Sequence, residues 1–293
     1  MTTSLFKDYC SMLDSGWTQE SPKQGTYTVF NLTEYSSGES EATVTTVKDS
    51  EPTRRKSIDT DSIHNNLLDS VPVDGDEAEQ LIMGATELKQ ISDLDKEENK
   101  QRSLRRARSV IRKKIIEGEL DHFLTLTYKE NKKDVAECWK DWKKFIRLVQ
   151  KKYPTLKYLV IIERQKRGAI HFHVAVHGFM HVQSVRRLWL QVVGQGNIDI
   201  KRRRHNQSMH GLAKYITKYL TKQYDELESF QNLYRCSKNI KLKQIKFYLP
   251  KEHAMTRAAD IDRALKIFIK EIKQFWHDSN GLFSCQWASS LAP

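Results

Sequence analysis

The sequence predicts an α+β fold: an antiparallel sheet with helices on one face, preceded by a mostly disordered acidic leader. Between residues 99 and 250, short apolar runs of strand length alternate with longer stretches in which apolar residues recur every three or four positions. Residues 1–98 are instead rich in Ser, Thr, Asp and Glu, and their apolar patches are short. We therefore expect a folded domain over 99–250 that survives removal of residues 1–98, followed by a C-terminal helical extension over 251–293.

The charge of the chain changes sign at about the same point. Residues 1–100 carry 9 Lys and Arg against 20 Asp and Glu, whereas the remaining 193 residues carry 40 against 17. Because each phosphate that a basic side chain neutralises releases bound counterions, so basic a region favours a nucleic-acid partner over a merely solvated surface. The acidic segment is typical of a solvating tail, with intramolecular cover of the basic region as the alternative.

Several classes of protein are disfavoured. The cysteines show no CxxC pair, which argues against a zinc finger or a disulfide framework; they are Cys10, Cys138, Cys236 and Cys285. No apolar run approaches the roughly 20 residues of a membrane span, and the N-terminus lacks the charged head and apolar body of a signal peptide. The expectation is a cytoplasmic protein without a membrane partner.

The expected elements of the central region alternate in a recognisable order. They are a helix over 101–120, a strand over 123–128, a helix over 133–152, strands over 156–163 and 170–178, a helix over 184–193, a strand over 197–202 and a helix over 209–224. From the first strand onward the order β, α, β, β, α, β is the ferredoxin-like pattern, which leaves one sheet face free to carry a site. A strand over 243–248 and a helix over 254–275 are expected to follow.

The most informative of these strands contains His171 and His173. Alternate side chains of a strand share a face, so both imidazoles point away from the apolar set that includes Phe172. Two imidazoles spaced in this way suit a divalent ion. Glu163 ends the preceding strand, and hairpin pairing brings it to the level of the histidines as a third ligand for Mn²⁺ or Mg²⁺.

Other interpretations of these residues stay open at this point. The histidines could be polar residues on a solvated sheet face, and Glu163 could simply pair with Arg164 or Lys166. Zinc is an alternative metal for the same donors.

The last helix of the central region carries a second set of chemical groups. Tyr215 and Tyr219 lie four residues apart and therefore share a helix face, and Lys218 and Lys222 each follow a tyrosine by three residues. A tyrosine hydroxyl, with a pKa of about 10, becomes a competent nucleophile beside an ammonium group or toward a metal-polarised phosphodiester. The alternative is one core tyrosine and one surface tyrosine on a basic DNA-binding helix.

In order and spacing, these motifs resemble those of the HUH endonucleases, in particular rolling-circle replication initiators with two active-site tyrosines from small phages and plasmids. The resemblance covers about residues 105–241. The matching segments are the Thr-rich strand 123–128, the segment 163–173 with its His-hydrophobic-His signature, the tyrosine helix 215–222 and a weaker trailing segment, 234–238.

The resemblance implies a specific chemistry. His171, His173 and Glu163 would hold a metal that polarises the scissile phosphate of single-stranded or supercoiled origin DNA. Tyr215 and Tyr219 would attack it, forming a 5′-phosphotyrosine and a free 3′-hydroxyl for a host polymerase, and the cut strand is later rejoined. Lys218 and Lys222 would position or neutralise the DNA.

Other functions are also compatible with these motifs. The sequence has no Walker A motif, so a host helicase would have to unwind the duplex. A transposase or relaxase of a mobile element is one alternative, although relaxases place their tyrosine before the histidines. A non-catalytic nucleic-acid-binding regulator on the same fold is the other.

Overall fold

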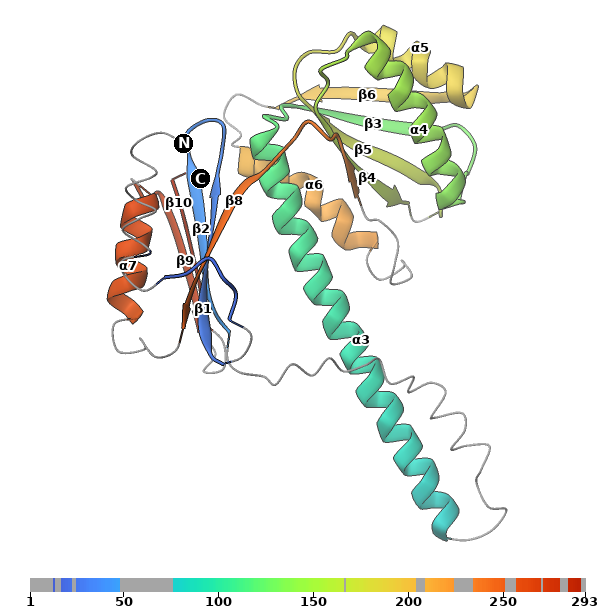
Figure 1. Cartoon of the computed structure of the whole chain (residues 1–293). Coiled ribbons are helices and arrows are strands. Elements are labelled where there is room, and N and C mark those ends of the chain that lie inside the picture. The colour runs from blue at the N-terminus through green and yellow to red at the C-terminus, as the bar shows by residue number, and fades with distance from the viewer. Residues whose placement is uncertain are drawn as a thin grey trace. The chain divides into compact units, whose positions relative to one another are not determined.

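The computed structural model describes residue 13 and residues 17–22, 25–47, 76–165, 167–203, 209–223, 234–250, 257–269, 271–279 and 284–290. These residues contain two five-stranded antiparallel sheets and five helices (Figure 1). The α+β class predicted from the sequence is confirmed.

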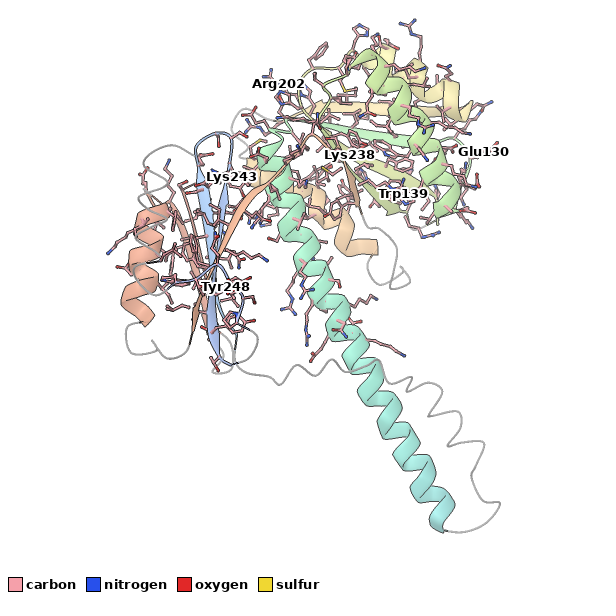
Figure 2. The ribbon with its side chains drawn as sticks, in the orientation of Figure 1. Glu130, Trp139, Arg202, Lys238, Lys243 and Tyr248 are labelled. Carbon is pink, nitrogen blue, oxygen red and sulfur yellow. The ribbon has the colours of Figure 1, made fainter. Side chains whose placement is uncertain are left out.

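The first sheet, which we call the site sheet, is built from the central region of the chain. Its strand order is β6-β3-β5-β4-β7, and all neighbours are antiparallel. The strands are β3 (His122–Tyr128), β4 (Tyr158–Arg164), β5 (Ile170–Val176), β6 (Gly196–Arg202) and β7 (Tyr234–Cys236). Arg202, labelled in Figure 2, marks the end of β6. The four expected strands of the ferredoxin-like pattern therefore form within one to three residues of their predicted bounds, and β7 is an addition.

Helices α4 (Val135–Lys152) and α5 (Val182–Val193) cover one face of the site sheet, as predicted (Figure 1). The α4 helix begins after Asp134, whose side chain accepts a hydrogen bond from the backbone N–H of Glu137 at 3.0 Å. Its apolar stripe packs against the even-numbered residues of β5, and Phe172 and Trp189 are both fully buried between helices and sheet. This core fixes which face of β5 turns outward.

Helix α6 (Met209–Gln223) packs against β4 and β5. Its Tyr219 ring stacks on His173, which lies on the face of β5 opposite Phe172. The face expected to carry a site is thus partly covered by the helix that carries the two tyrosines.

The second sheet, which we call the flanking sheet, joins segments that are far apart in the sequence. Its order is β8-β1-β2-β10-β9, and its strands are β1 (Tyr27–Glu34), β2 (Ser40–Val47), β8 (Lys243–Pro250), β9 (Gln274–Ser279) and β10 (Ser284–Ser289). Lys243 and Tyr248, labelled in Figure 2, lie near the two ends of β8. Helix α7 (Arg257–Phe268) packs on a core that includes Phe30 and Phe247.

The expectation of a mostly disordered leader over 1–98 is wrong for two segments. Residues 27–34 and 40–47 form β1 and β2, and helix α3 (Asp76–Glu117) extends the helix expected over 101–120 toward the N-terminus. The two strands alternate apolar with Ser, Thr and Asn residues, and their outer neighbours β8 and β10 lie some 200 residues away in sequence. Local composition therefore hid them. Residues 1–12 and 48–75 lie outside the described residues.

The C-terminal extension also differs from the purely helical prediction. Helix α7 ends at Phe268 rather than near 275, and two strands follow it. Ile272 and Phe275 continue the apolar spacing of the helix, but both are exposed, because Phe275 lies on edge strand β9. Pairing of β9 with β10 satisfies backbone groups that a longer helix would have used.

The C-terminal end of α3 is tied to the flanking sheet by buried charges. Arg112 makes a bidentate ion pair with Glu41 on β2, and Lys113 donates to the Thr33 hydroxyl at 2.8 Å. Burial alone would raise the pKa of Glu41, but the hydrogen bond and charge of Arg112 outweigh burial and hold that pKa below its usual value. The carboxylate stays ionised and pinned.

Candidate active site

Strand pairing brings Glu163 and the two histidines together, as the hairpin interpretation predicts. Glu163 on β4 is the direct cross-strand partner of His171 on β5. His173 lies two residues farther along the same face, and its Nε2 is 2.6 Å from Oε2 of Glu163, a hydrogen-bonding distance. All three groups therefore occupy one spot on the face opposite α4 and α5.

His171 is buried and distinctive among these groups. Within the described part of the chain, its Nε2 has no hydrogen-bond partner. Burial lowers the pKa of His171 below its usual value, the nearby His173 lowers it further, and the Glu163 carboxylate acts in the opposite direction. A neutral imidazole with a free ring nitrogen is the form that binds a metal ion.

The cluster is suited to a metal by its donors, although the groups are not spread as a finished site. Among the described residues, no three His, Cys, Asp or Glu side chains stand arranged to hold an ion as they are. The reason is visible in the 2.6 Å contact, because His173 and Glu163 share a proton through the same atoms that would ligate a metal. Adjacent ligands of an octahedral Mg²⁺ stand about 2.9 Å apart, so replacing that proton by a metal asks for a small displacement.

Helix α6 brings its two tyrosines to this cluster. The Tyr219 ring stacks on the His173 imidazole with 3.7 Å between ring centroids, and its hydroxyl hydrogen-bonds to the Tyr215 hydroxyl at 2.7 Å. Tyr219 is 8% exposed, whereas Tyr215 is 36% exposed. The i, i+4 spacing thus places one hydroxyl in the site and the other at its mouth, in mutual contact.

The surroundings of Tyr219 disfavour its phenolate. Burial raises the pKa of Tyr219 above its usual value, and the hydrogen bond with Tyr215 and the negative charge of Glu163 raise it further. A metal ion beside Glu163 and His173 would reverse the electrostatic part of this effect. Nucleophilic use of this hydroxyl therefore depends on a cation at the cluster.

The predicted lysines differ in what the structure shows of them. The ammonium of Lys218 lies 4.6 Å from the ring centroid of Tyr215 and 5.1 Å from that of Tyr219. It is close enough to both rings for cation–π attraction and to neutralise charge beside either hydroxyl. Lys222 belongs to α6, and its side chain lies outside the described residues.

Phe123 is a site residue that the sequence did not single out. Its ring lies parallel to the His173 imidazole at 5.5 Å and meets the Tyr215 ring edge-on at 5.1 Å. It therefore supports both a histidine and a tyrosine from the next strand. The available signal was its odd-numbered place on β3, which puts it on the same face as the histidines once the strands are paired.

A second group was also missed. The site face extends beyond α6 onto β3 and β6, where Thr125, Thr127, Asn197, Asp199 and Lys201 share it. The three β6 residues are exposed, and Lys201 pairs with Asp199 at 3.0 Å. We call these five residues the β3–β6 strip. The alternation Asn-Ile-Asp-Ile-Lys in the sequence marks the polar face of β6, but nothing local shows which site it adjoins.

The arrangement combines a two-histidine, one-carboxylate cluster, two linked phenols and an ammonium group. In the described residues, no helix combines the length and apolar character needed to cross a membrane.

Comparison with known proteins agrees with the location of this site. Searches of curated proteins and of solved structures gave no significant match. Residues 121–224, which run from β3 through α6 and contain every side chain of the cluster, match a family model described as replication-associated protein ORF2. The segment that builds the candidate site is therefore similar to a family of replication-associated proteins, which supports a role in initiating DNA replication with DNA as the partner.

Proposed function

We propose that this protein is a rolling-circle replication initiator of the HUH type, which nicks one DNA strand at an origin through a tyrosine nucleophile and later rejoins it. The observation that carries this proposal is the stacking of Tyr219 on His173, which itself contacts Glu163. Tyrosine, histidine and carboxylate from three different elements thus meet at one point. A structural tyrosine on a basic helix has no need of that company.

Each group has a role that follows from its surroundings. His171, His173 and Glu163 would hold a divalent ion, Mn²⁺ or Mg²⁺, which supplies Lewis-acid polarisation of a phosphodiester. Tyr215 and Tyr219 supply the attacking oxygens. Lys218, lying over both rings, balances negative charge that develops as a phenol loses its proton.

The covalent step balances without an external energy source. A tyrosine Oη forms a bond to phosphorus, the bond from phosphorus to the 3′-oxygen breaks, and the phenol proton passes through solvent to that oxygen. The products are a 5′-phosphotyrosine and a 3′-hydroxyl. The reverse attack, by a 3′-hydroxyl on the phosphotyrosine, reseals the strand and returns the phenol.

The expected partners follow from this role. Single-stranded or supercoiled origin DNA is the substrate, held mainly by the basic surface of residues 101–293. The 3′-hydroxyl would prime a host polymerase, and a host helicase would unwind the duplex.

The test is a cleavage assay on the full chain. Single-stranded DNA from around the gene is incubated with Mn²⁺ or Mg²⁺ and resolved on a denaturing gel, and any adducted peptide is mapped by mass spectrometry. The proposal expects a metal-dependent adduct on Tyr215 or Tyr219. DNA binding without any adduct at any metal concentration would instead identify a non-catalytic regulator, and an adduct on another residue would contradict the site.

A further inference from the structure

The β3–β6 strip begins at the cluster and ends in a cleft. One row of paired residues crosses the site sheet from Glu163 on β4 to His171 on β5, Thr127 on β3 and Asn197 on β6. Neighbouring strands are about 4.8 Å apart, so Asn197 lies about 10 Å from His171 along this row. That span corresponds to about three stacked nucleotides.

The cleft at the end of the row has a volume of about 410 Å³. Its lining includes Thr127, Lys129, Leu190, Gln195 and Asn197. This combination of one apolar wall, two amides, a hydroxyl and an ammonium is typical of sites that orient a flat polar ligand. No assignment made so far uses it.

The wall of the cleft is fixed by close backbone packing. Trp189 Nε1 donates to the Thr127 carbonyl at 3.1 Å, and the Lys129 N–H donates to the Gln195 carbonyl at 3.3 Å. A Cβ at Gly196 would lie 2.4 Å from the Thr127 carbonyl oxygen, so only glycine permits this approach. The cleft is therefore a preformed feature of the sheet edge.

Asn197 has a defined polarity within the cleft. Its Oδ1 accepts a hydrogen bond from the Ile198 N–H at 2.8 Å. This bond orients the amide, so the NH₂ group is what Asn197 can offer to a ligand. Lys129 at the same rim is an exposed cation. A ligand with acceptor atoms on a planar ring and a nearby negative charge satisfies both groups.

We propose that the β3–β6 strip guides the unpaired strand away from the cut and that the cleft binds one flanking nucleotide, reading acceptor atoms of its base through Asn197 and Gln195. This inference rests on the proposed nickase function, because the cluster must hold the scissile phosphate. Leu190 contributes apolar contact to the base, and Lys129 contacts a phosphate. The cleft would then contribute to the choice of cutting site.

The experiment uses the full chain and a single-stranded cleavage site flanked by randomised positions. Cut products of the wild type, Asn197→Ala, Asn197→Asp and Gln195→Ala are sequenced. Wild type should prefer bases at one or two positions near the cut, and each variant should reduce that preference by about tenfold at the same position, since one good base contact discriminates by about that much. Asn197→Asp should reduce the preference most, because it replaces the NH₂ donor by a charged acceptor.

Gln191→Ala is the matched control, because Gln191 is an exposed amide on α5 outside the cleft lining. Circular dichroism establishes that each variant is folded. The inference is overturned if folded Asn197 and Gln195 variants keep the wild-type preference, or if wild type shows no preference at any flanking position. Failure of wild type to cut any strand would overturn the proposed function itself, and the inference with it.

Discussion

At the scale of single residues, the two tyrosines differ in exposure but share one hydrogen bond. Tyr215 lies at the mouth of the site, and Tyr219 lies on His173. Their hydroxyl oxygens are 2.7 Å apart, so either one reaches nearly the same point with a small side-chain adjustment. This geometry favours two nucleophiles that take turns, because the second is already in place while the first is occupied.

The tyrosine pair leads to the first prediction. Tyr215→Phe and Tyr219→Phe should each still form a covalent adduct in a single round, while Tyr215→Phe/Tyr219→Phe should lose it by about three orders of magnitude or more. Phe preserves the ring stacking on His173 and Phe123 and removes only the hydroxyl. Adduct formation is followed on denaturing gels with labelled DNA. If one single variant abolishes the adduct and the other cycles normally, the protein is a one-tyrosine enzyme.

The second prediction concerns the metal cluster. His171→Ala and His173→Ala should abolish nicking, as should chelation of divalent ions, whereas DNA affinity should change little because binding rests on the basic surface. Nicking and affinity are measured side by side on the same oligonucleotide. His177→Ala is a suitable control, since His177 is exposed and its ring bonds the Glu119 carbonyl instead. Full cleavage by the doubly substituted His171→Ala/His173→Ala protein would contradict the assignment.

Burial of His171 gives a third prediction, on pH and stability. Its folded pKa is lowered, so the unfolded chain takes up the proton first as pH falls. The free energy of unfolding of metal-free protein should therefore decline below about pH 6.5, the ordinary value for His. Replacing His171 by Gln should make this decline shallower. Urea unfolding in a chelator at several pH values measures it, and identical slopes for both proteins would contradict the prediction.

The chemistry of the site was predictable because its signals are periodic. His171 and His173 alternate with core residues on one strand, and Tyr215 and Tyr219 repeat at one helical turn, so each pair reveals its own face. Phe123 and Asn197 carry no such signal. Their roles arise from strand pairing across 50 to 75 residues of sequence, which a local pattern does not encode.

At the scale of elements, the buried ion pairs at the end of α3 have a clear energetic role. Glu41 is 1% exposed and bonds both Arg112 and Lys113. Removing one partner of such a cluster leaves the other charges buried without compensation, which costs more than the pair itself contributes.

The fourth prediction follows from that imbalance. Glu41→Ala should lower the free energy of unfolding by about 3 kcal/mol. Glu98→Ala is the matched control, because Glu98 pairs with Arg102 on the exposed surface of the same helix and should cost less than about 1 kcal/mol. Chemical denaturation of both variants supplies the comparison. Equal effects would mean that the Glu41 cluster does not stabilise the fold.

Elements with their own amphipathic period were located well from the sequence, and elements defined by distant partners were not. The α4 helix and strand β5 show apolar stripes that match the observed buried faces. Strands β1 and β2 have a Ser- and Thr-rich composition that resembles a solvated segment, and they become strands because β8 and β10 pair with their outer edges. Their stabilisation is non-local.

At the scale of the whole chain, the flanking sheet joins both ends of the sequence. Strands β1 and β2 come from residues 27–47, and β8, β9 and β10 from residues 243–289. The domain division at residues 98 and 250 expected from composition therefore separates strands that share one sheet. Composition distinguishes acidic from basic segments, but it carries no information on which strands pair.

The fifth prediction tests that connection. Removing residues 1–98 takes away β1 and β2, the strands between β8 and β10, and uncovers the apolar core around Phe247, Leu249 and Leu265. The truncated protein should aggregate or bind a hydrophobic dye, even though every residue of the metal cluster and both tyrosines remain. Removing only residues 1–12 spares Trp17 and every other described core residue, so that shorter variant should melt as the full chain does. Size-exclusion chromatography and thermal melts compare the three proteins. A monomeric 99–293 fragment with an unchanged cooperative melt would show that the flanking sheet needs neither β1 nor β2, and that the composition boundary near residue 98 is the physical one after all.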